Sequence, residues 1–450
     1  MTDAKDIDDS LEFLRYFEKY TQNPDLGALV QEKLSADKKR LNLGHHKLKE
    51  EDFKALAQIQ PLSRLHSMNL DETGLTSSGL KHLATSKIFS NLSTLSLANN
   101  NLDDEGIFYL SKSPHLSRLT ELSLSSNEIG MLGAKVLFQS SLPGQLKKLD
   151  LSYNRIEPLG IKSISEAPQK LPIRTLNLRD TCLGDDGLKQ IARHVCLEAL
   201  ETLDLSDNTI TFAGMEALAR SNPFPKIKRL VLSNNPVGDD GIYAIAQSDA
   251  FSTLEELTLI NASLTTDSAI SLAESKNMTN LKLLDLNNND IRAEGVEALA
   301  KSANMKGLEN LDLGENKLGP DGAVAIAESE HLSGLKYLRL NNNNIMDKGA
   351  IALARSKNLI HLEALFLENE NWIHAPGTKA IAESQSLSSL RKLVLTLNVI
   401  GDEGARYLAN STSLAGLVNL NVAGNRLSPS AENALIHSTT LVNLKALEIV

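Results

Sequence analysis

The sequence contains few aromatic residues, few cysteines and no long uninterrupted hydrophobic run. Only 4% of its 450 residues are Phe, Trp or Tyr, whereas 42% are hydrophobic, so any core must consist mainly of aliphatic side chains. The two cysteines, Cys182 and Cys196, show no CxxC or paired spacing. We therefore interpret both as reduced, structural thiols.

Targeting and membrane-spanning segments are also absent from the sequence. No stretch approaches the about 20 apolar residues of a membrane helix. The first ten residues, MTDAKDIDDS, are acidic and lack the apolar centre of a signal peptide. These features predict a cytoplasmic protein with no membrane partner, while export by a route that needs no signal peptide stays open as an alternative.

Positive charge is in deficit. The formal net charge is −10, with 46 Lys and Arg against 56 Asp and Glu. Nucleic acids and anionic membranes attract basic surfaces, so this balance argues against both as partners. We expect a protein partner, and a basic one in preference to an acidic one; the oligomeric state is not determined by the sequence.

Signatures of catalysis and metal binding are missing as well. The sequence has no GxSxG, HExxH, Cys/His framework or EF-hand loop, and no glycine-rich phosphate-binding motif. Four aspartates that recur at one position of the pattern described below, Asp150, Asp204, Asp285 and Asp312, are at least 27 residues apart. Paired acid–base chemistry needs closer carboxylates. We therefore expect no enzymatic activity, no cofactor and no metal site.

What fills the sequence is a repeat of 27 residues. In the stretch 308–334 it reads Leu-x-x-Leu-x-Leu-x-x-Asn-x-Leu, followed by a Gly six residues after the Asn and by an Ala-rich phrase that ends in Ser. Copies aligned on the first Leu start at fifteen positions from Leu65 to Leu444, and a degenerate first copy starts at Lys38. Such a period predicts a solenoid, because one copy cannot bury its apolar face alone.

Each copy predicts one strand, one turn and one helix. The Leu-x-Leu phrase alternates apolar and polar residues, as does a strand buried on one face. The Asn three residues after the last strand Leu is expected to bond backbone groups of the turn, so that stacked copies form an asparagine ladder. Strands pack about 4.8 Å apart and helices about 8–10 Å apart, so we expect strands on the inside of an arc and helices on the outside.

Residues 1–37 precede the repeats. The spacing of Leu11, Phe13, Leu14, Tyr16, Phe17 and Tyr20 predicts an amphipathic helix, and that of Leu26, Leu29, Val30 and Leu34 predicts a second. We predict a helical N-terminal cap over residues 1–37, which covers the first strand edge, and a repeat domain of about sixteen copies over residues 38–450. A short docking helix is the alternative for the first segment.

The phrase LxxLxLxxNxLxxxGxxxLA resembles the leucine-rich repeat of the ribonuclease-inhibitor type, over about residues 38–450. Residues 113–124, SPHLSRLTELSL, are similar to bacterial members in particular. The resemblance implies an α/β leucine-rich repeat solenoid, or horseshoe, with a concave parallel β-sheet and convex α-helices. It also implies a non-enzymatic scaffold that binds a protein on the concave face. A GTPase-activating protein of the Ran-activator type and a bacterial secreted effector that binds a host regulator remain alternatives.

The candidate binding residues lie on the predicted concave face of the later copies. Each strand exposes the two positions beside its central Leu, and in the amino-terminal half these are mostly small and polar. The predicted protein-binding residues are Tyr337, Arg339, Phe366, Trp372, Lys392 and Val394. Aromatic and Arg side chains on a Ser- and Asn-rich surface are typical of interface hot spots. Chance substitution on a tolerant face is the alternative.

One residue is inserted in the same region. Between Leu367 and Asn371 the copy has one residue more than the others. The insertion predicts a bulge that turns Trp372 and the acidic pair Glu368 and Glu370 outward, beside Phe366. Neutral drift within a turn is the alternative.

Overall fold

The computed structural model describes residues 24–168, 170–193 and 197–449. The first helix predicted for the cap, around Phe13 to Tyr20, and the second cysteine, Cys196, lie outside this range. The chain divides into two compact units: unit 1 comprises Met1–Ile210 and Arg220–Ile227, and unit 2 comprises Thr211–Ala219 and Lys228–Val450. We describe each unit separately.

Unit 1 alternates short strands with helices. Its described strands are β1 (Arg40–Asn42), β2 (Ser67–Asn69), β3 (Thr94–Ser96), β4 (Glu121–Ser123), β5 (Lys148–Asp150), β6 (Thr175–Asn177) and β7 (Thr202–Asp204). Its described helices are α2 (Pro24–Lys33), α3 (Glu50–Leu56), α4 (Ser77–Ala84), α5 (Asp104–Ser111), α6 (Met131–Gln139), α7 (Glu157–Ser165) and α8 (Gly184–Ala192). The 3-10 helices are η1 (Gln60–Arg64), η2 (Lys87–Phe89) and η3 (Leu142–Gly144). The division between the units passes through α9 (Phe212–Ser221).

Unit 2 repeats the same alternation. Its strands are β8 (Arg229–Val231), β9 (Glu256–Thr258), β10 (Leu283–Asp285), β11 (Asn310–Asp312), β12 (Tyr337–Arg339), β13 (Ala364–Phe366), β14 (Lys392–Val394), β15 (Asn419–Asn421) and β16 (Ala446–Glu448). Its helices are α10 (Gly238–Ala246), α11 (Thr266–Ala273), α12 (Arg292–Lys301), α13 (Gly319–Glu328), α14 (Met346–Arg355), α15 (Ala375–Ala382), α16 (Gly401–Ala409) and α17 (Pro429–Ile436). The 3-10 helices are η4 (Asp249–Phe251) and η5 (Ala303–Gly307).

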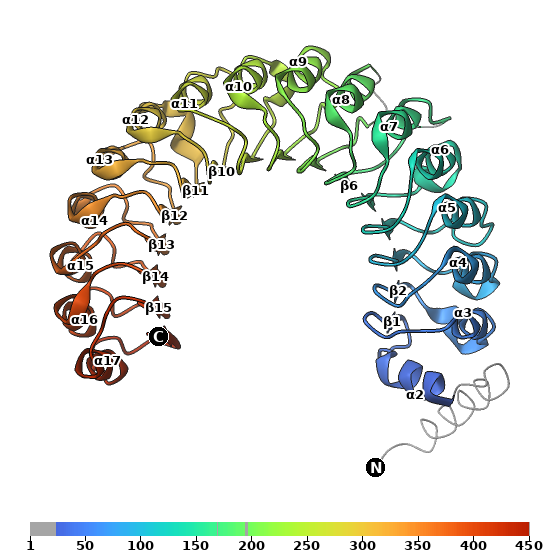
Figure 1. Ribbon diagram of the computed structural model, residues 1–450, viewed down its shortest axis with the longest axis horizontal. Coiled ribbons are helices and arrows are strands. Elements are labelled where there is room, and N and C mark those ends of the chain that lie inside the picture. Colours follow the sequence, from blue (N-terminus) through green and yellow to red (C-terminus); the bar gives the residue numbers. More distant parts are fainter. Residues whose placement is uncertain (1–23, 169, 194–196, 450) are drawn as a thin grey trace. The chain divides into compact units, whose positions relative to one another are not determined.

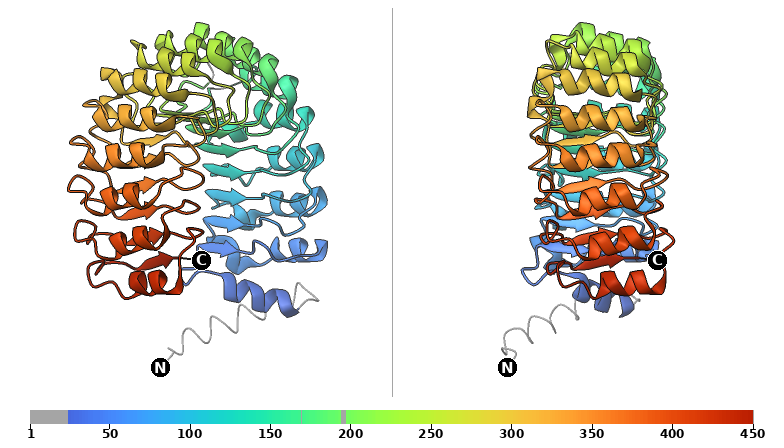
Figure 2. Two further views of the ribbon diagram at one scale, coloured as in Figure 1. Left: turned by 60° about the vertical axis from the view of Figure 1, so that its left-hand side comes forward. Right: turned by 90° about the vertical axis from the view of Figure 1, so that its left-hand side faces the viewer.

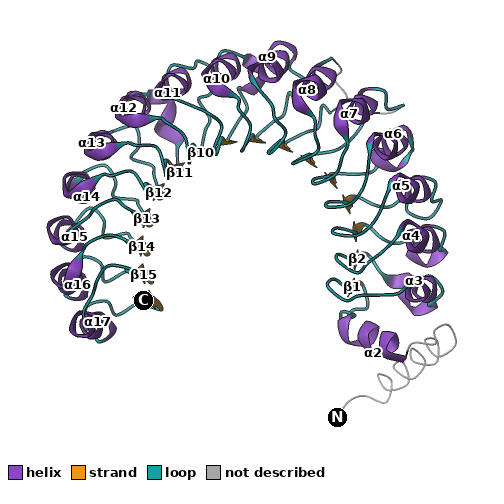
Figure 3. Cartoon of the chain, in the orientation of Figure 1, coloured by secondary structure: helices purple, strands orange, loops and turns teal. Residues whose placement is uncertain are grey.

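Neighbouring strands within each unit pair in parallel and in the register of the repeat. In unit 2, for example, Leu284 of β10 lies opposite Leu311 of β11, which lies opposite Leu338 of β12. The central Leu of these strands is buried and the residues beside it are half-exposed. Within each unit the strands form the inner, concave side and the helices the outer, convex side (Figures 1 and 3). The helices of unit 2, yellow-green to red in Figure 2, follow one another in a single row. The predicted α/β repeat fold is confirmed.

The predicted asparagine ladder is present in the structure. Asn343, which is fully buried, donates from Nδ2 to the carbonyl of Leu313 in the preceding copy at 2.7 Å. Its Oδ1 accepts the backbone N–H of Asn316 at 2.9 Å and of Leu318 at 3.3 Å. Each such amide satisfies backbone groups of two copies at once, which fixes the turn between strand and helix.

The glycine six residues after the Asn has a packing role. A Cβ on Gly322 would lie 2.9 Å from Cβ of Leu318, the residue one turn earlier. At the equivalent Gly349 a Cβ would lie 2.8 Å from Cβ of Ala323 on the preceding helix. Real Cβ atoms do not approach so closely. Glycine is therefore favoured at this position, because a side chain would clash with the residue one turn earlier or with the preceding helix.

The serine that ends each Ala-rich phrase bonds the preceding copy. Ser329 Oγ donates to the Ala300 carbonyl at 2.5 Å and accepts the Leu332 N–H at 3.1 Å. The same bond to an Ala carbonyl is made by Ser86, Ser113, Ser248, Ser275, Ser302, Ser356, Ser384, Ser411 and Ser438. The recurring Ala-x-Ser therefore forms a second ladder, at the carboxyl ends of the helices, which the sequence pattern did not reveal to us.

Replacing Ser329 by alanine should lower the free energy of unfolding by about 1–2 kcal/mol, because the buried Ala300 carbonyl and Leu332 N–H both lose their partner. Urea unfolding followed by circular dichroism measures the change. Ser388→Ala is the control. Ser388 lies in the segment before β14, and its hydroxyl makes no hydrogen bond within the described residues, so the variant should leave the midpoint unchanged. Equal midpoints for the Ser329 variant and the wild-type protein would contradict this role.

The described part of the predicted cap consists of α2 and the residues that follow it. Leu26 and Val30 on α2 are buried, and Leu34 forms an antiparallel bridge with Leu41 of β1. This segment therefore covers the outer edge of β1, as expected of a cap. The division of the chain at residue 37 into a cap and a repeat domain stays a prediction.

The structural role inferred for Cys182 is wrong. Its thiol is free and exposed, in the turn that joins β6 to α8. The preceding residue, Thr181, is buried and occupies the ladder position, where its hydroxyl donates to the Leu178 carbonyl at 2.6 Å. The sequence did not distinguish these neighbours because both are small residues of intermediate polarity.

Candidate protein-binding surface

In-register pairing in unit 2 places five of the six predicted binding residues together on the concave face. Tyr337 and Arg339 flank the central Leu of β12, Phe366 ends β13, and Lys392 and Val394 flank the central Leu of β14. The register sets Arg339 opposite Phe366 and Phe366 opposite Val394. Parallel strands are about 4.8 Å apart, so large side chains in one column must touch.

The contact takes the form of alternating cations and rings. The ring centroids of Tyr337 and Phe366 are 4.8 Å apart, and Arg339 Cζ lies 4.5 Å from the Phe366 centroid. Lys392 Nζ approaches the same ring to 5.1 Å. A cation within about 6 Å of an aromatic ring is attracted to its face. Phe366 is thus held between two cationic side chains and a tyrosine.

The expectation that Phe366 and Val394 are exposed is wrong. Phe366 is 6% exposed and Val394 9%. The side chains of Arg339 and Lys392 lie over the Phe366 ring and cover it. The surface offered to a partner therefore consists of Tyr337, Arg339 and Lys392, with Phe366 and Val394 as its support.

Trp372 lies apart from this cluster. Its side chain is 49% exposed, in the turn that leads from β13 to α15, where its backbone has a left-handed φ of 53°. No ring contact joins Trp372 to Tyr337 or Phe366 within the described residues. The predicted outward position of Trp372 is therefore correct, but its predicted place beside Phe366 is not supported.

The inserted residue widens the turn without breaking the ladder. Asn369 and Glu370 both adopt left-handed φ angles, 59° and 49°. Asn371 remains buried, and its Nδ2 donates to the Leu340 carbonyl at 2.8 Å and to the Leu367 carbonyl at 3.1 Å. The extra residue is thus absorbed before the ladder position.

Only one member of the acidic pair behaves as predicted. Glu370 is exposed, but the side chain of Glu368 is only 14% exposed and turns toward Arg339, with Oε1 3.5 Å from Nη1. Arg339 also approaches Asp312, with 3.4 Å between Nε and Oδ2, and its Nε donates to the Tyr337 hydroxyl at 3.1 Å. Sequence reasoning predicted that Glu368 turns outward. The contact was missed because Arg339 lies on the neighbouring strand, and attraction between residues of different copies cannot be read from local sequence.

Two of the aspartates that the sequence separated are neighbours in space. Asp285 ends β10 directly opposite Asp312 at the end of β11. Burial, and then the charge of Asp312, raise the pKa of Asp285 from 3.8 to about 6. Burial also raises the pKa of Asp312, against the attraction of Arg339. The argument that these carboxylates are too far apart to interact was wrong for this pair, because a separation of one repeat along the chain is one strand spacing in the sheet.

The next column, just past the strand ends, holds residues that sequence reasoning missed, with the exception of Glu368. It contains Asn287, Gly314, Asn341 and Glu368 in successive copies, where unit 1 has mostly small residues such as Ser125, Ser152 and Ser206. Comparing this third column between the two halves of the chain could have identified them.

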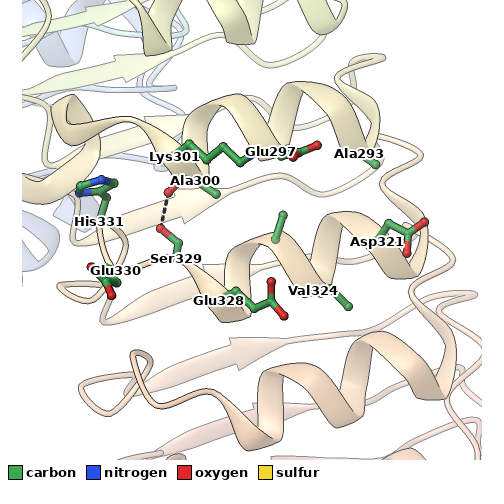
Figure 4. Close-up of a pocket in the computed structure, with 11 residues that line it drawn as sticks. Ala293, Glu297, Ala300, Lys301, Asp321, Val324, Glu328, Ser329, Glu330 and His331 are labelled. Carbon is green, nitrogen blue, oxygen red and sulfur yellow. Dashed lines mark hydrogen bonds and ion pairs between the residues drawn. The ribbon is translucent and has the colours of Figure 1, made fainter.

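A separate hollow of about 470 Å³ lies on the convex side, between α12 and α13 (Figure 4). Ala293, Ala300 and Val324 line it, and Glu297, which is paired with Lys301, stands at its rim. Small side chains on facing helices account for the hollow.

Within the described residues, no group of three or more His, Cys, Asp or Glu side chains could hold a metal ion. None of the described helices combines the length and the apolar character needed to cross a membrane.

Comparison with known proteins agrees with this geometry. Ten segments match the family described as Leucine Rich repeat: residues 90–111, 115–138, 146–165, 171–192, 199–219, 225–246, 277–300, 308–327, 331–354 and 386–409. A search of curated proteins gives no match. Fold and repeat together define the class: this is a leucine-rich repeat solenoid. The chain is accordingly a leucine-rich repeat protein.

Solved structures of similar fold come from several sources. The structure of a TLR13–ssRNA13 complex is 21% identical, with a TM-score of 0.55, over 96% of this chain and 65% of that one. This chain thus spans less than two thirds of that protein. An internalin from Listeria monocytogenes is 18% identical, with a TM-score of 0.45, over 98% of this chain and 94% of that one. A leucine-rich repeat protein from Leptospira interrogans is 20% identical, with a TM-score of 0.44, over 95% and 92%.

Proposed function

We propose that this chain is a non-enzymatic scaffold that binds a protein partner on the concave face of unit 2, through Tyr337, Arg339 and Lys392. The observation that carries the proposal is the cluster of these three side chains over Phe366. Leucine-rich repeat proteins are generally scaffolds without catalytic activity, and aromatic and Arg side chains supply most of the energy in many interfaces.

The preorganisation of Arg339 supports this role. Its guanidinium is held by the Tyr337 hydroxyl, by the Phe366 ring and by the carboxylates of Asp312 and Glu368. A side chain that is already ordered loses less entropy when a partner covers it. Trp372 enters the proposal as an outlying contact in the turn after β13, and Phe366 and Val394 as support beneath the contact residues.

We further propose that the repeats are of the ribonuclease-inhibitor-like type, and that the protein is cytoplasmic. The repeat phrase supports the first. We propose a basic protein partner and no nucleic acid, because the net charge of −10 repels a phosphate backbone. The TLR13 structure is a complex with RNA, so this exclusion needs its own test.

Photo-cross-linking from position 337 tests the proposal. A benzophenone amino acid in place of Tyr337 should capture a partner protein, and the same residue in place of Thr175, at the equivalent position of β6 in unit 1, should not. With the captured partner purified, Tyr337→Ala combined with Lys392→Ala should raise its Kd at least about 10-fold, a loss of about 1.4 kcal/mol. Thr175→Ala combined with Thr202→Ala is the matched control in the same column and should leave Kd unchanged.

Equal Kd for both double variants would overturn the proposed contact. Two further arms address the alternative functions. Single-stranded RNA at physiological salt should not bind, and saturable binding would replace the protein partner by a nucleic acid. A panel of small GTPases should show no faster GTP hydrolysis in the presence of the chain, and an acceleration would establish the GTPase-activating alternative.

A further inference from the structure

The carboxylate of Asp285 has fewer partners than the aspartates at the same position of unit 1. Asp150 and Asp204 each accept the N–H and the hydroxyl of the serine two residues later, Ser152 and Ser206. Asp285 accepts only the N–H of Asn287, at 3.0 Å. The Asn287 side chain instead donates across to Asp312 Oδ1, at 3.3 Å. The second oxygen of Asp285 thus has no hydrogen-bond donor or ion pair recorded among the described residues.

A second acceptor without a donor lies beside the same pair. Asn341 is 5% exposed, and its Oδ1 has no hydrogen-bond partner in the described part of the chain. This oxygen lies over Gly314, where a Cβ would be 2.1 Å from it and 2.4 Å from Asn287 Nδ2. The N–H of Gly314 donates to Asp312 Oδ1, at 3.0 Å. Asn341 Oδ1 therefore lies over Gly314 and near Asn287 Nδ2, and both of these residues donate to Asp312.

Acceptors outnumber donors throughout this cluster. Two carboxylates, of Asp312 and Glu368, pair with one guanidinium, that of Arg339, at 3.4 and 3.5 Å. The third carboxylate, of Asp285, feels the charge of Arg339 but forms no ion pair with it. Glu368 Oε2, like Asn341 Oδ1, is buried without a donor among the described residues. Buried acceptors without donors are costly, so a ligand that supplies donors and positive charge would be stabilised here.

We infer that Asp285, Asp312 and Asn341 form a subsite on the concave face that receives a lysine side chain of the partner protein. The inference rests on the proposed function and specifies the chemistry of the partner. An ammonium group brings three donors, no acceptor and one positive charge, which is what the cluster lacks. Its alkyl stem would lie along the half-buried strand surface, toward Tyr337.

The electrostatics of the pair agree with this assignment. The charged groups that face Asp285 are Asp312 on β11 and Arg339 on β12, and the facing residue of β9, Thr258, is uncharged. Burial and the charge of Asp312 raise the pKa of Asp285 to about 6. A bound cation favours the ionised carboxylate, so affinity for a cation should decrease as the pH falls below about 6.

Pentalysine is the probe for this subsite, with calorimetry at low salt as the measurement. Asp285→Asn should weaken pentalysine binding about five-fold or more, as expected for a partly buried charge pair worth about 1 kcal/mol. Asp204→Asn removes the same charge from the same position of unit 1 and should change the Kd less than about two-fold. The wild-type affinity should decrease between about pH 7 and pH 5, and this dependence should be smaller in the Asp285 variant.

Equal weakening by the two variants would show that pentalysine is attracted only by net charge, and would overturn the subsite. Dependence on Asp285 for pentaarginine but not for pentalysine would overturn the lysine assignment. Failure here is distinguishable from failure of the proposed function, because the cross-linking experiment uses Tyr337 and Lys392. A partner that depends on those residues but not on Asp285 removes the subsite alone.

Discussion

Replacing Asn343 by alanine should lower the free energy of unfolding by about 3–5 kcal/mol, because four backbone groups in a buried turn lose their partner at once. The Asn343 amide accepts the N–H groups of Asn316 and Leu318 and donates to the carbonyls of Leu313 and Asn341. Alanine cannot replace any of these bonds, and water cannot reach the turn. Urea unfolding monitored by circular dichroism gives the change.

Asn310→Ala is the control for the ladder variant. Asn310 is also an asparagine of unit 2, but it is half-buried on β11 and no side-chain hydrogen bond of it is recorded in the described residues. Its replacement should change the free energy of unfolding by less than about 1 kcal/mol. Similar losses for the two variants would show that the ladder contributes no more than an ordinary strand side chain.

Replacing Asp285 by asparagine should raise the free energy of unfolding near neutral pH by about 1–2 kcal/mol, because it removes a half-buried negative charge beside Asp312. The pKa of Asp285 is about 6 in the folded protein, against 3.8 for a free side chain. Between these values the folded state binds more protons than the unfolded state. Wild-type stability should therefore decrease as the pH rises from about 4 to about 6, with the full deficit present above that range.

The pH dependence separates this effect from a general one. The advantage of the Asp285 variant should shrink as the pH falls from about 6 to about 4, where the wild-type carboxyl becomes protonated. Asp204→Asn should show no such gain, because Asp204 already accepts the Ser206 hydroxyl. Thermal unfolding at several pH values measures both variants. A gain for Asp285→Asn that is the same at all pH values would contradict a charge effect.

The fold could be predicted from the 27-residue periodicity because the same pattern of residues recurs from copy to copy. Leu311 and Leu313 are buried, and Asn316 enters the ladder, as the alternation and spacing predicted. Short elements repeated many times leave little freedom to a solenoid, so local pattern and global fold agree. The serine ladder was not predicted because a Ser at a helix end also fits an exposed turn.

The candidate site was predictable only in part. Aligning the copies of the repeat showed which residues occupy the same strand position in successive copies. The proximity of Tyr337 and Phe366 was therefore predicted correctly. The aligned copies did not predict how exposed Phe366 is, because its exposure depends on the directions of the Arg339 and Lys392 side chains. The interaction of Asp285 with Asp312 was missed for a different reason: distance along the chain was taken for distance in space.

The widened turn before Asn371 has a consequence for how such a chain can vary in length. Asn371 still bonds Leu340 of the preceding copy although one residue more separates it from β13. The asparagine therefore sets the register of the helix and of the next strand. The segment just before the asparagine can gain a residue without displacing either of them. Length variation at that point adds new side chains beside the concave face while leaving the stacked layers unchanged, so this turn is where the surface can diversify independently of the core.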